Sequence, residues 1–111
     1  MYYVVKTLEI SSSHQLYLDY ESKCESQHGH NWMIKVYCRA KELDGNGMVC
    51  DFTDIKRLIH GRIDHKNLNE VLDFNPTAEN IARWVVETVP QCYRAEVWES
   101  RDNMAAYELD D

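Results

Sequence analysis

The chain has 111 residues, of which 44% are hydrophobic and 28% are charged, with only 4 Gly and 2 Pro. This length suits one domain, residues 1–111, with a modest core, and the composition excludes collagenous, low-complexity and intrinsically disordered proteins. The 19 acidic residues outnumber the 12 basic ones and give a net charge of −7, so we expect no sequence-independent binding to nucleic acid phosphates.

Two strands are predicted in the first forty residues, over 3–13 and from position 28 onward. Their apolar residues have even numbers, as expected for strands with one buried face: Val4, Leu8, Ile10, Trp32, Ile34, Val36 and Cys38. His14, His28 and His30 have the same parity, so we expect their side chains on the apolar face.

Two helices and two further strands follow. After the turn at 44–47, a short extended stretch over 48–52 precedes a helix whose apolar positions have helical spacing: Ile55, Leu58, Ile59 and Ile63. A second helix begins at the N-cap Thr77 and ends before Pro90. Residues 94–100 and 104–109 are predicted strands around a turn. The order β-β-α-α-β-β indicates an α+β fold, with both helices on one face of an antiparallel sheet.

The histidines form a candidate metal site. Two histidines at positions i and i+2 of a strand lie on one side, roughly 6 to 7 Å apart at their Cα atoms, which suits two ligands of one metal ion. His28 and His30 have this spacing, and His14 emerges from the same face of a strand expected to pair with theirs. Three imidazoles leave a fourth position open, as in catalytic zinc sites, where a bound hydroxyl is acidified. The alternative is that the three histidines are buried residues, each hydrogen-bonded to a backbone group.

The cysteines have irregular spacing without a CxxC pair, and we expect them to be reduced in the cytoplasm. Residues 1–7 lack the features of a signal peptide, and no apolar run approaches the roughly 18 to 20 residues of a membrane helix. Cys24, in a polar loop four residues before His28, could be a catalytic base, because a thiol near zinc and histidine has a lowered pKa. The other three are predicted to fill the core: Cys38, Cys50 and Cys92.

Two further histidines lie near the end of the first helix. His60 lies beside the apolar stripe and is predicted to be solvated. His65 follows the helix directly behind Asp64, where a cationic side chain could cap the helix and interact favourably with its dipole.

Six motifs follow one another along the chain: Ser11-Ser12-Ser13-His14, Cys24-x-x-x-His28-Gly29-His30, Met48-Val49-Cys50-Asp51-Phe52, Asp64-His65-Lys66-Asn67-Leu68-Asn69, Pro76-Thr77-Ala78-Glu79-Asn80 and Trp98-Glu99-Ser100. In this order they resemble the signatures of the 6-pyruvoyltetrahydropterin synthase superfamily, over nearly the whole chain. The short length and the three-residue gap between Cys24 and His28 resemble the bacterial branch that makes 6-carboxy-5,6,7,8-tetrahydropterin for queuosine (7-deazapurine) biosynthesis, a tRNA modification pathway.

The resemblance implies the tunnelling fold, in which three subunits join their sheets into a barrel and two trimers form a homohexamer. Such closure would remove the unpaired edges of a small open sheet. It also implies a zinc-dependent lyase that binds a small pterin triphosphate, 7,8-dihydroneopterin triphosphate, and releases triphosphate and acetaldehyde. No membrane partner is expected.

The roles that the resemblance implies fall on nine positions of this chain. The zinc ligands would be His14, His28 and His30, and the thiol base would be Cys24. Asp64 would orient the charge-relay residue His65, and Glu99 would bind the guanidine-like edge of the pterin and complete the relay. Thr77 and Glu79 match a motif near the pterin pocket, although helix capping explains them equally well.

Several alternatives stay open at this point. Glu99 could be an ordinary surface residue of its strand, although its odd parity is shared with the apolar Ala95 and Val97. No basic cluster is evident for the triphosphate, for which Lys23, Lys66 and Arg101 are candidates. The product could be 6-pyruvoyltetrahydropterin, formed by eliminating triphosphate from the same substrate, or the chain could be a noncatalytic zinc- or pterin-binding module.

Overall fold

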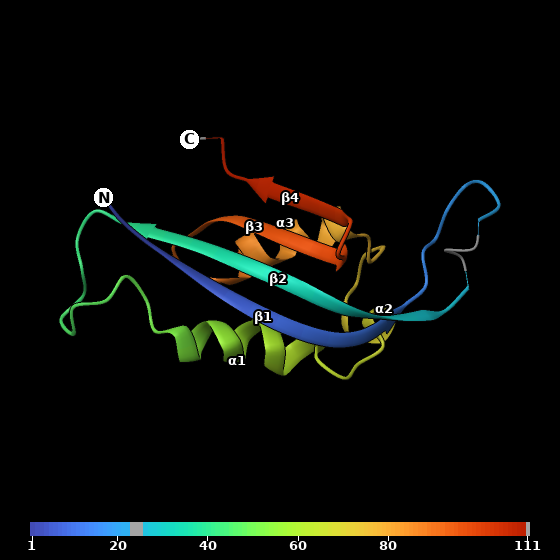
Figure 1. Cartoon of the computed structure of the whole chain (residues 1–111), viewed down its shortest axis with the longest axis horizontal. Helices are drawn as coiled ribbons and strands as arrows, with labels where there is room; N and C mark the ends of the chain where they lie inside the picture. Colours follow the sequence, from blue (N-terminus) through green and yellow to red (C-terminus); the bar gives the residue numbers. More distant parts are fainter. Residues whose placement is uncertain (23–25, 111) are drawn as a thin grey trace.

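The computed structural model describes residues 1–22 and 26–110. Four strands form one antiparallel sheet in the order β1-β2-β3-β4. The elements follow the chain as β1 (Tyr2–His14), β2 (His28–Ala40), α1 (Phe52–Ile63), α2 (Leu68–Val71), α3 (Ala78–Thr88), β3 (Cys92–Ser100) and β4 (Asn103–Glu108). The predicted α+β fold is therefore confirmed, and the one-turn helix α2 is an addition to it (Figure 1).

The sheet has one apolar face, as its alternating sequence predicts. Its buried residues include Leu8 and Ile10 of β1 and a longer series in β2: Trp32, Ile34, Val36 and Cys38. β1 and β2 pair in a single register, which places His14 opposite His28 and Ser12 opposite His30. The predicted common face of the three histidines is thereby confirmed, because side chains alternate along a strand with a period of two.

Helix α1 covers the β1 end of this face. It buries Ile55, Ile59 and Ile63 against the sheet. The prediction of an extended stretch over 48–52 is wrong. The Asp51 side chain accepts a hydrogen bond from the Thr53 N–H at 2.8 Å, so α1 already begins at Phe52. An N-cap carboxylate satisfies a backbone donor that would otherwise be unpaired, and it stops the preceding chain from continuing as a strand.

Helix α3 covers β3 and β4. Its N-cap is Thr77, as predicted, whose Oγ1 accepts a hydrogen bond from the Asn80 N–H at 3.1 Å. The helix buries a continuous stripe against the sheet: Ile81, Ala82, Val85 and Val86. Cys38 and Cys92 are buried in the same core, which confirms their predicted packing role, while Cys50 is only half-buried at its margin.

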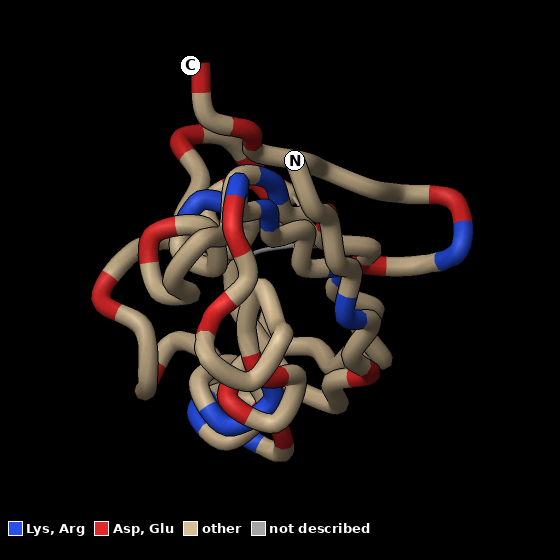
Figure 2. The backbone as a smooth tube through the Cα atoms, turned by 90° about the vertical axis from the view of Figure 1, so that its left-hand side faces the viewer, with Lys and Arg blue, Asp and Glu red and all other residues tan. Residues whose placement is uncertain are grey.

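The helices leave the other face and both edges of the sheet uncovered (Figure 1). Acidic and basic positions are distributed over most elements (Figure 2). In the described part of the chain, every helix is too short or too polar to cross a membrane.

Candidate metal centre

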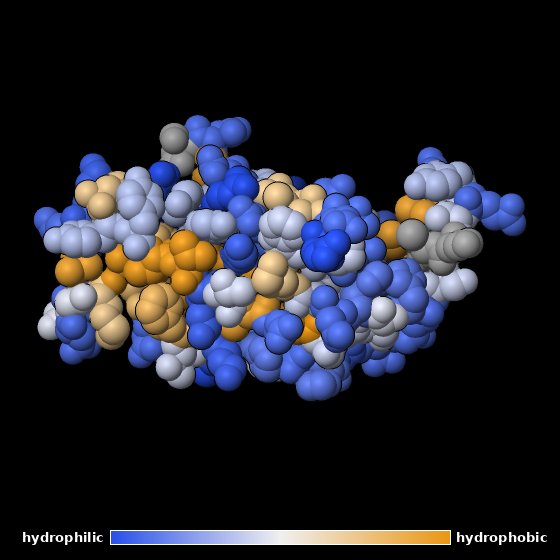
Figure 3. All heavy atoms as spheres, in the orientation of Figure 1, coloured by the Kyte–Doolittle hydropathy of each residue, from blue (hydrophilic) through white to orange (hydrophobic). Residues whose placement is uncertain are grey.

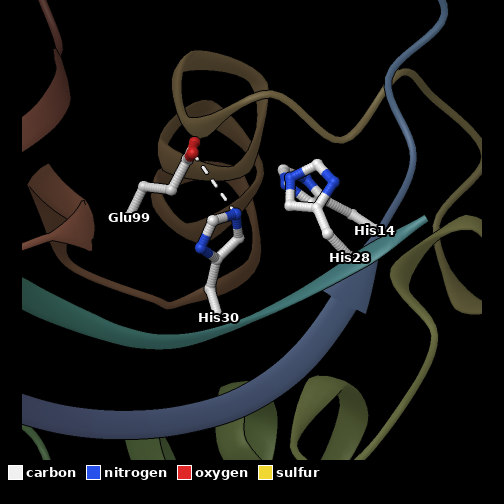
Figure 4. A group of neighbouring side chains, drawn as sticks. All are labelled: His14, His28, His30 and Glu99. Carbon is white, nitrogen blue, oxygen red and sulfur yellow. Dashed lines mark hydrogen bonds and ion pairs between the residues drawn. The ribbon is translucent and has the colours of Figure 1, made fainter. Parts of the chain in front are cut away.

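Three histidines and one glutamate meet at one end of the sheet, on its apolar face (Figure 4). His14 is the last residue of β1, and His28 and His30 lie at the start of β2. Glu99 comes from the end of β3. One side-chain nitrogen or oxygen of each residue lies within 4.8 Å of the corresponding atoms of the others.

Backbone carbonyls fix the protonation of two of the imidazoles. His14 Nδ1 lies 2.8 Å from the carbonyl oxygen of Pro76, and His28 Nδ1 lies 2.6 Å from that of Ser26. A carbonyl can only accept, so each Nδ1 carries the proton and, in the neutral ring, each Nε2 presents a lone pair. A hydrogen bond from a histidine to a carbonyl is the arrangement that orients metal-binding imidazoles.

The two lone pairs face each other. His14 Nε2 and His28 Nε2 are 3.0 Å apart. Two unprotonated nitrogens repel at this distance unless a cation lies beside both of them. The Nε2 atoms of two imidazoles on one tetrahedral zinc would be about 3.3 Å apart, from Zn–N bonds of about 2.0 to 2.1 Å. The observed spacing is therefore close to that of two ligands of a single ion.

His30 and Glu99 form the second half of the cluster. His30 Nε2 is buried and has no hydrogen-bond partner among the described residues, while a carboxylate oxygen of Glu99 lies 3.3 Å away (Figure 4). The register of β3 with β4 shifts between Trp98 and Ser100, so Glu99 is the extra residue of a bulge. Bulges re-aim a side chain, and this one directs a carboxylate at an imidazole on the neighbouring strand.

Burial favours the neutral, metal-binding form of two of the imidazoles, those of His14 and His30. Desolvation lowers the pKa of His14 below its ordinary value, and His28 and His30 add to this effect, although Pro76 and Glu99 oppose it. Desolvation also lowers the pKa of His30, against the opposing charge of Glu99. Both rings are therefore neutral near pH 7, and a neutral ring offers a lone pair.

Trp32 forms the floor of the site. Its ring contacts those of His14 and His30 edge to face, with centroid distances of 4.8 and 5.1 Å, and its indole N–H donates to the carbonyl of Ser12 at 3.3 Å. The sequence identified Trp32 only as core. The carbonyls of Pro76 and Ser26 were missed altogether, because a backbone oxygen leaves no signature in the residue type; only the motif around Pro76 points to that segment.

Asp64 and His65 form a separate pair at the outer edge of β1. Asp64 accepts a hydrogen bond from the Ser11 N–H at 2.9 Å, and its other oxygen lies 3.4 Å from His65 Nε2 and 3.2 Å from His60 Nε2. His60, expected to be solvated, is thus half-buried beside this carboxylate. The His65 side chain is 81% exposed. Within the described chain Asp64 and His65 make contact, but neither contacts Glu99, so one subunit does not assemble the expected relay.

The remaining predicted residues have simpler surroundings. Thr77 caps α3, and Glu79 is exposed in its first turn, where a carboxylate interacts favourably with the helix dipole. Thr77 is adjacent to the site only through Pro76, whose carbonyl holds His14. Cys24 and Lys23 lie outside the described residues.

The donor set fits a metal ion. Among the residues that the structure describes, two paired Nε2 lone pairs, one buried Nε2 without a hydrogen bond and one carboxylate converge, and no cationic side chain belongs to this group. Imidazole and carboxylate are ligands that zinc accepts. The cluster could therefore bind one divalent cation through His14, His28 and His30, with Glu99 next to the fourth position.

Comparisons with known proteins give the family and the relatives of this chain. Residues 3–110 match the 6-pyruvoyl tetrahydropterin synthase family. The 6-carboxy-5,6,7,8-tetrahydropterin synthase of Bacillus subtilis is 31% identical over 91 residues, which cover 76% of this chain and 62% of that protein. The dihydroneopterin monophosphate aldolase of Pyrococcus furiosus is 38% identical over 68 residues, 59% of this chain and 57% of that protein. The chain thus spans less than two thirds of the length of these two relatives.

A solved structure has the same fold. The 6-pyruvoyl tetrahydropterin synthase of Caenorhabditis elegans superposes with a TM-score of 0.77 and 25% sequence identity, and the match covers 98% of this chain and 96% of that one.

Proposed function

This chain belongs to the 6-pyruvoyl tetrahydropterin synthase family, and we propose that it is a zinc-dependent 6-carboxy-5,6,7,8-tetrahydropterin synthase. The reaction converts 7,8-dihydroneopterin triphosphate and water to 6-carboxytetrahydropterin, triphosphate and acetaldehyde. We place it in the cytoplasm, in queuosine (7-deazapurine) biosynthesis. The similarity to the Bacillus subtilis enzyme supports the choice of product. The observation that carries the proposal is the convergence of three imidazoles and Glu99 in a chain of this family.

His14, His28 and His30 would hold the zinc ion. When bound, zinc would supply Lewis acidity, which makes abstraction of a neighbouring carbon-bound proton feasible near neutral pH. The carbonyls of Pro76 and Ser26 hold two of the rings in the ligand tautomer. The buried ring of Trp32 packs against His14 and shields this side of the cluster from water.

We assign Glu99 to the binding of the substrate's pterin ring. Its carboxylate has two acceptor oxygens, which match the paired N–H donors of a guanidine-like edge. Its position beside His30 would place the ring next to the metal and the side-chain hydroxyls on it. Substrate and metal would then share one pocket, with Glu99 as the anchor of the ring.

Proton transfer is assigned to Cys24 and to the Asp64–His65 pair. Since the His65 side chain is 81% exposed beside the outer edge of β1, we propose that this pair completes the site of a neighbouring subunit. An exposed imidazole held by a carboxylate can accept a proton and return it. The site would then be shared between subunits.

The experiment is an incubation of the zinc-loaded protein with 7,8-dihydroneopterin triphosphate, followed by identification of the pterin and separate measurement of acetaldehyde. We expect 6-carboxytetrahydropterin and one acetaldehyde per turnover. Triphosphate release without acetaldehyde would instead indicate the 6-pyruvoyl product. Absence of any turnover, with zinc and pterin still bound, would indicate a noncatalytic binding module.

A further inference from the structure

The backbone that leaves β1 after His14 is held by the side chains of two asparagines. The Gln15 N–H donates to Asn69 Oδ1 at 2.7 Å, and Asn69 Nδ2 donates back to the Gln15 carbonyl at 2.8 Å. Two residues further on, the Tyr17 N–H donates to Asn75 Oδ1 at 2.9 Å, and Asn75 Nδ2 donates to the Tyr17 carbonyl at 3.0 Å. Each amide thus satisfies the N–H and the C=O of one residue, as a neighbouring strand would.

These contacts continue a series of hydrogen bonds that begins within β1. Odd-numbered residues near the end of this strand direct their backbone groups to its outer edge. There the Ser11 carbonyl accepts from the His65 N–H at 2.7 Å, and the Ser13 N–H donates to the Lys66 carbonyl at 3.1 Å. The pairing of β1 with β2 ends at His14. The two asparagine side chains therefore bind this edge at positions 15 and 17, beyond the end of the strand.

The asparagines belong to a segment that is itself anchored in the fold. Asn69 follows the buried Leu68 in α2, and Asn75 precedes the buried Pro76. The Asn75 carbonyl accepts a hydrogen bond from the Thr77 N–H at 2.8 Å, next to the start of α3. Both asparagine side chains are half-buried. Their amides therefore have fixed positions from which to hold residues 15–17.

The held backbone directly follows a residue of the metal cluster. His14 is the last residue of β1, and the end of a strand frays unless the chain beyond it is held. The His14 ring donates from Nδ1 to the Pro76 carbonyl at 2.8 Å. Asn75 holds Tyr17 with its side chain and is the residue before Pro76. Two adjacent residues thus fix both the ring of His14 and the backbone that follows it.

We propose that Asn69 and Asn75 are positioning residues of the metal centre, which fix His14 by holding the backbone after it. This inference rests on the metal-binding part of the proposed function. A metal ion binds more tightly to ligands that are already in place, because ordering them on binding costs conformational entropy. Neither asparagine belongs to the ligand group, so each would act only through His14.

The test is competition for zinc between the full chain and a chromophoric chelator. Asn75→Ala should weaken zinc binding by roughly 10 to 100-fold, the range for loss of groups that orient a ligand. Asn69→Ala should weaken it in the same direction, and the double variant should bind zinc less tightly than either. The matched control is Asp51→Ala, which removes the N-cap of α1 and should lower stability without a change in zinc affinity.

A second measurement follows the His14 ring in the absence of metal. In the heteronuclear NMR spectrum of the zinc-free parent, the Nδ1 proton bonded to the Pro76 carbonyl should exchange slowly with water. In Asn75→Ala this proton should exchange faster, while in Asp51→Ala it should exchange as in the parent. A merely structural role of the asparagines would lower the melting temperature of these variants and leave the ring proton and the zinc affinity unchanged.

Zinc affinities of Asn75→Ala and Asn69→Ala equal to that of the parent would overturn the proposal, as would an equal loss in Asp51→Ala. If Asn75→Ala does not fold, Asn69→Ala provides the same test. If the parent binds no zinc, the His14 ring proton decides alone, and unchanged exchange in the asparagine variants contradicts the inference. The two proposals fail separately: a protein without turnover whose zinc affinity depends on Asn75 retains the positioning role, whereas an active protein indifferent to both asparagines loses it.

Discussion

Glu99 lies beside three imidazoles that could hold a metal ion, next to the position that they would leave open. Three neutral histidines leave the full charge of a divalent cation in place, and a nearby carboxylate offsets part of it. The same carboxylate binds the pterin ring in our proposal, so one residue would interact with both the metal ion and the substrate. Removing a histidine and removing the carboxylate should therefore have different consequences, since only the histidines are assigned as ligands.

We expect the parent protein to purify with about one zinc per chain and His30→Ala with far less, because two histidines and a carboxylate hold zinc more weakly than three histidines do. Elemental analysis measures this directly. His60→Ala is the matched control, since His60 contacts Asp64 and lies outside the cluster. Undiminished zinc in His30→Ala would remove His30 from the site, and an unchanged circular dichroism spectrum would show that metal loss is not unfolding.

Cys24 is assigned as the catalytic base by its motif, and its thiol can be tested apart from the fold. Cys24→Ala should bind zinc and pterin as the parent does, while kcat falls by roughly 10² to 10⁴-fold, the range for loss of a positioned acid–base group. Cys50→Ala, which alters a half-buried thiol outside the site, is the control. If Cys24→Ala turned over substrate at the parental rate, the proton transfer would have to be assigned to His65 and not to Cys24.

At the level of the elements, β3 carries a partly buried charge network on the face opposite the helices. The carboxylate of Glu96 accepts hydrogen bonds from Tyr37 at 2.9 Å, Arg94 at 3.0 Å and Trp98 at 3.2 Å. Burial acts to raise the pKa of Glu96, but these three hydrogen bonds, that of Arg94 foremost, outweigh it and hold the pKa below its ordinary value. The network ties β2 to β3 on the side that lacks a helix.

Glu96→Ala should lower the free energy of unfolding by about 1 to 3 kcal/mol, because Tyr37 and Trp98 lose their acceptor and Arg94 loses the nearer of its two carboxylate partners, keeping only Glu108. Denaturant unfolding at neutral pH measures this loss. Glu87→Ala is the control, because Glu87 pairs with Arg83 on the exposed face of α3 and surface ion pairs contribute little to stability. A loss in Glu96→Ala no greater than in the control would mean that the network does not stabilise the sheet.

The same network predicts a pH dependence. A carboxylate whose pKa is lower in the folded chain stabilises it above the unfolded value of 4.5, and this contribution disappears as the pH falls through the lower folded value. Unfolding measurements between neutral pH and about pH 3 should therefore show a smaller acid loss of stability in Glu96→Gln than in the parent. Parallel curves for the two proteins would contradict the assignment.

At the level of the whole molecule, the sheet ends in two strands, β1 and β4, whose outer edges lack a strand partner within residues 1–22 and 26–110. Among these residues, the segment 64–67 bonds to β1 near Ser11 and Ser13, and β4 pairs with β3. Apolar side chains also gather at the end of the molecule that carries the N-terminus (Figure 3). There Tyr2, Tyr3, Leu43 and Phe52 line a hollow of about 320 Å³ and are largely exposed. Open edges beside apolar surface favour association.

We expect a trimer or a homohexamer in solution, in which β1 of one subunit pairs with β4 of the next and the Asp64–His65 pair meets a neighbouring metal site. Multi-angle light scattering over a range of concentrations tests this. A stable monomer at micromolar concentration would contradict the shared site as well as the barrel. Association without activity loss in His65→Ala would contradict only the shared site.

The faces of the strands and the ends of the longer helices follow from local residue patterns. The alternation of Leu8, Ile10 and His14 is local, and the pleat of a strand converts it directly into a common face with His28 and His30. Thr77 likewise acts within its own turn, which is why its cap could be predicted. The stretch before Phe52 was misjudged because the cap at Asp51 outweighed a weak strand pattern.

Only the tertiary structure decided which partners these faces meet. The approach of Glu99 to His30 depends on the register of β3 and on a bulge, and the His14 contact with Pro76 joins residues 62 positions apart. The packing of 65–67 against β1 likewise joins segments that are more than fifty positions apart. Register, bulges and backbone carbonyls are set by packing between distant segments, and a local residue pattern carries no information about them.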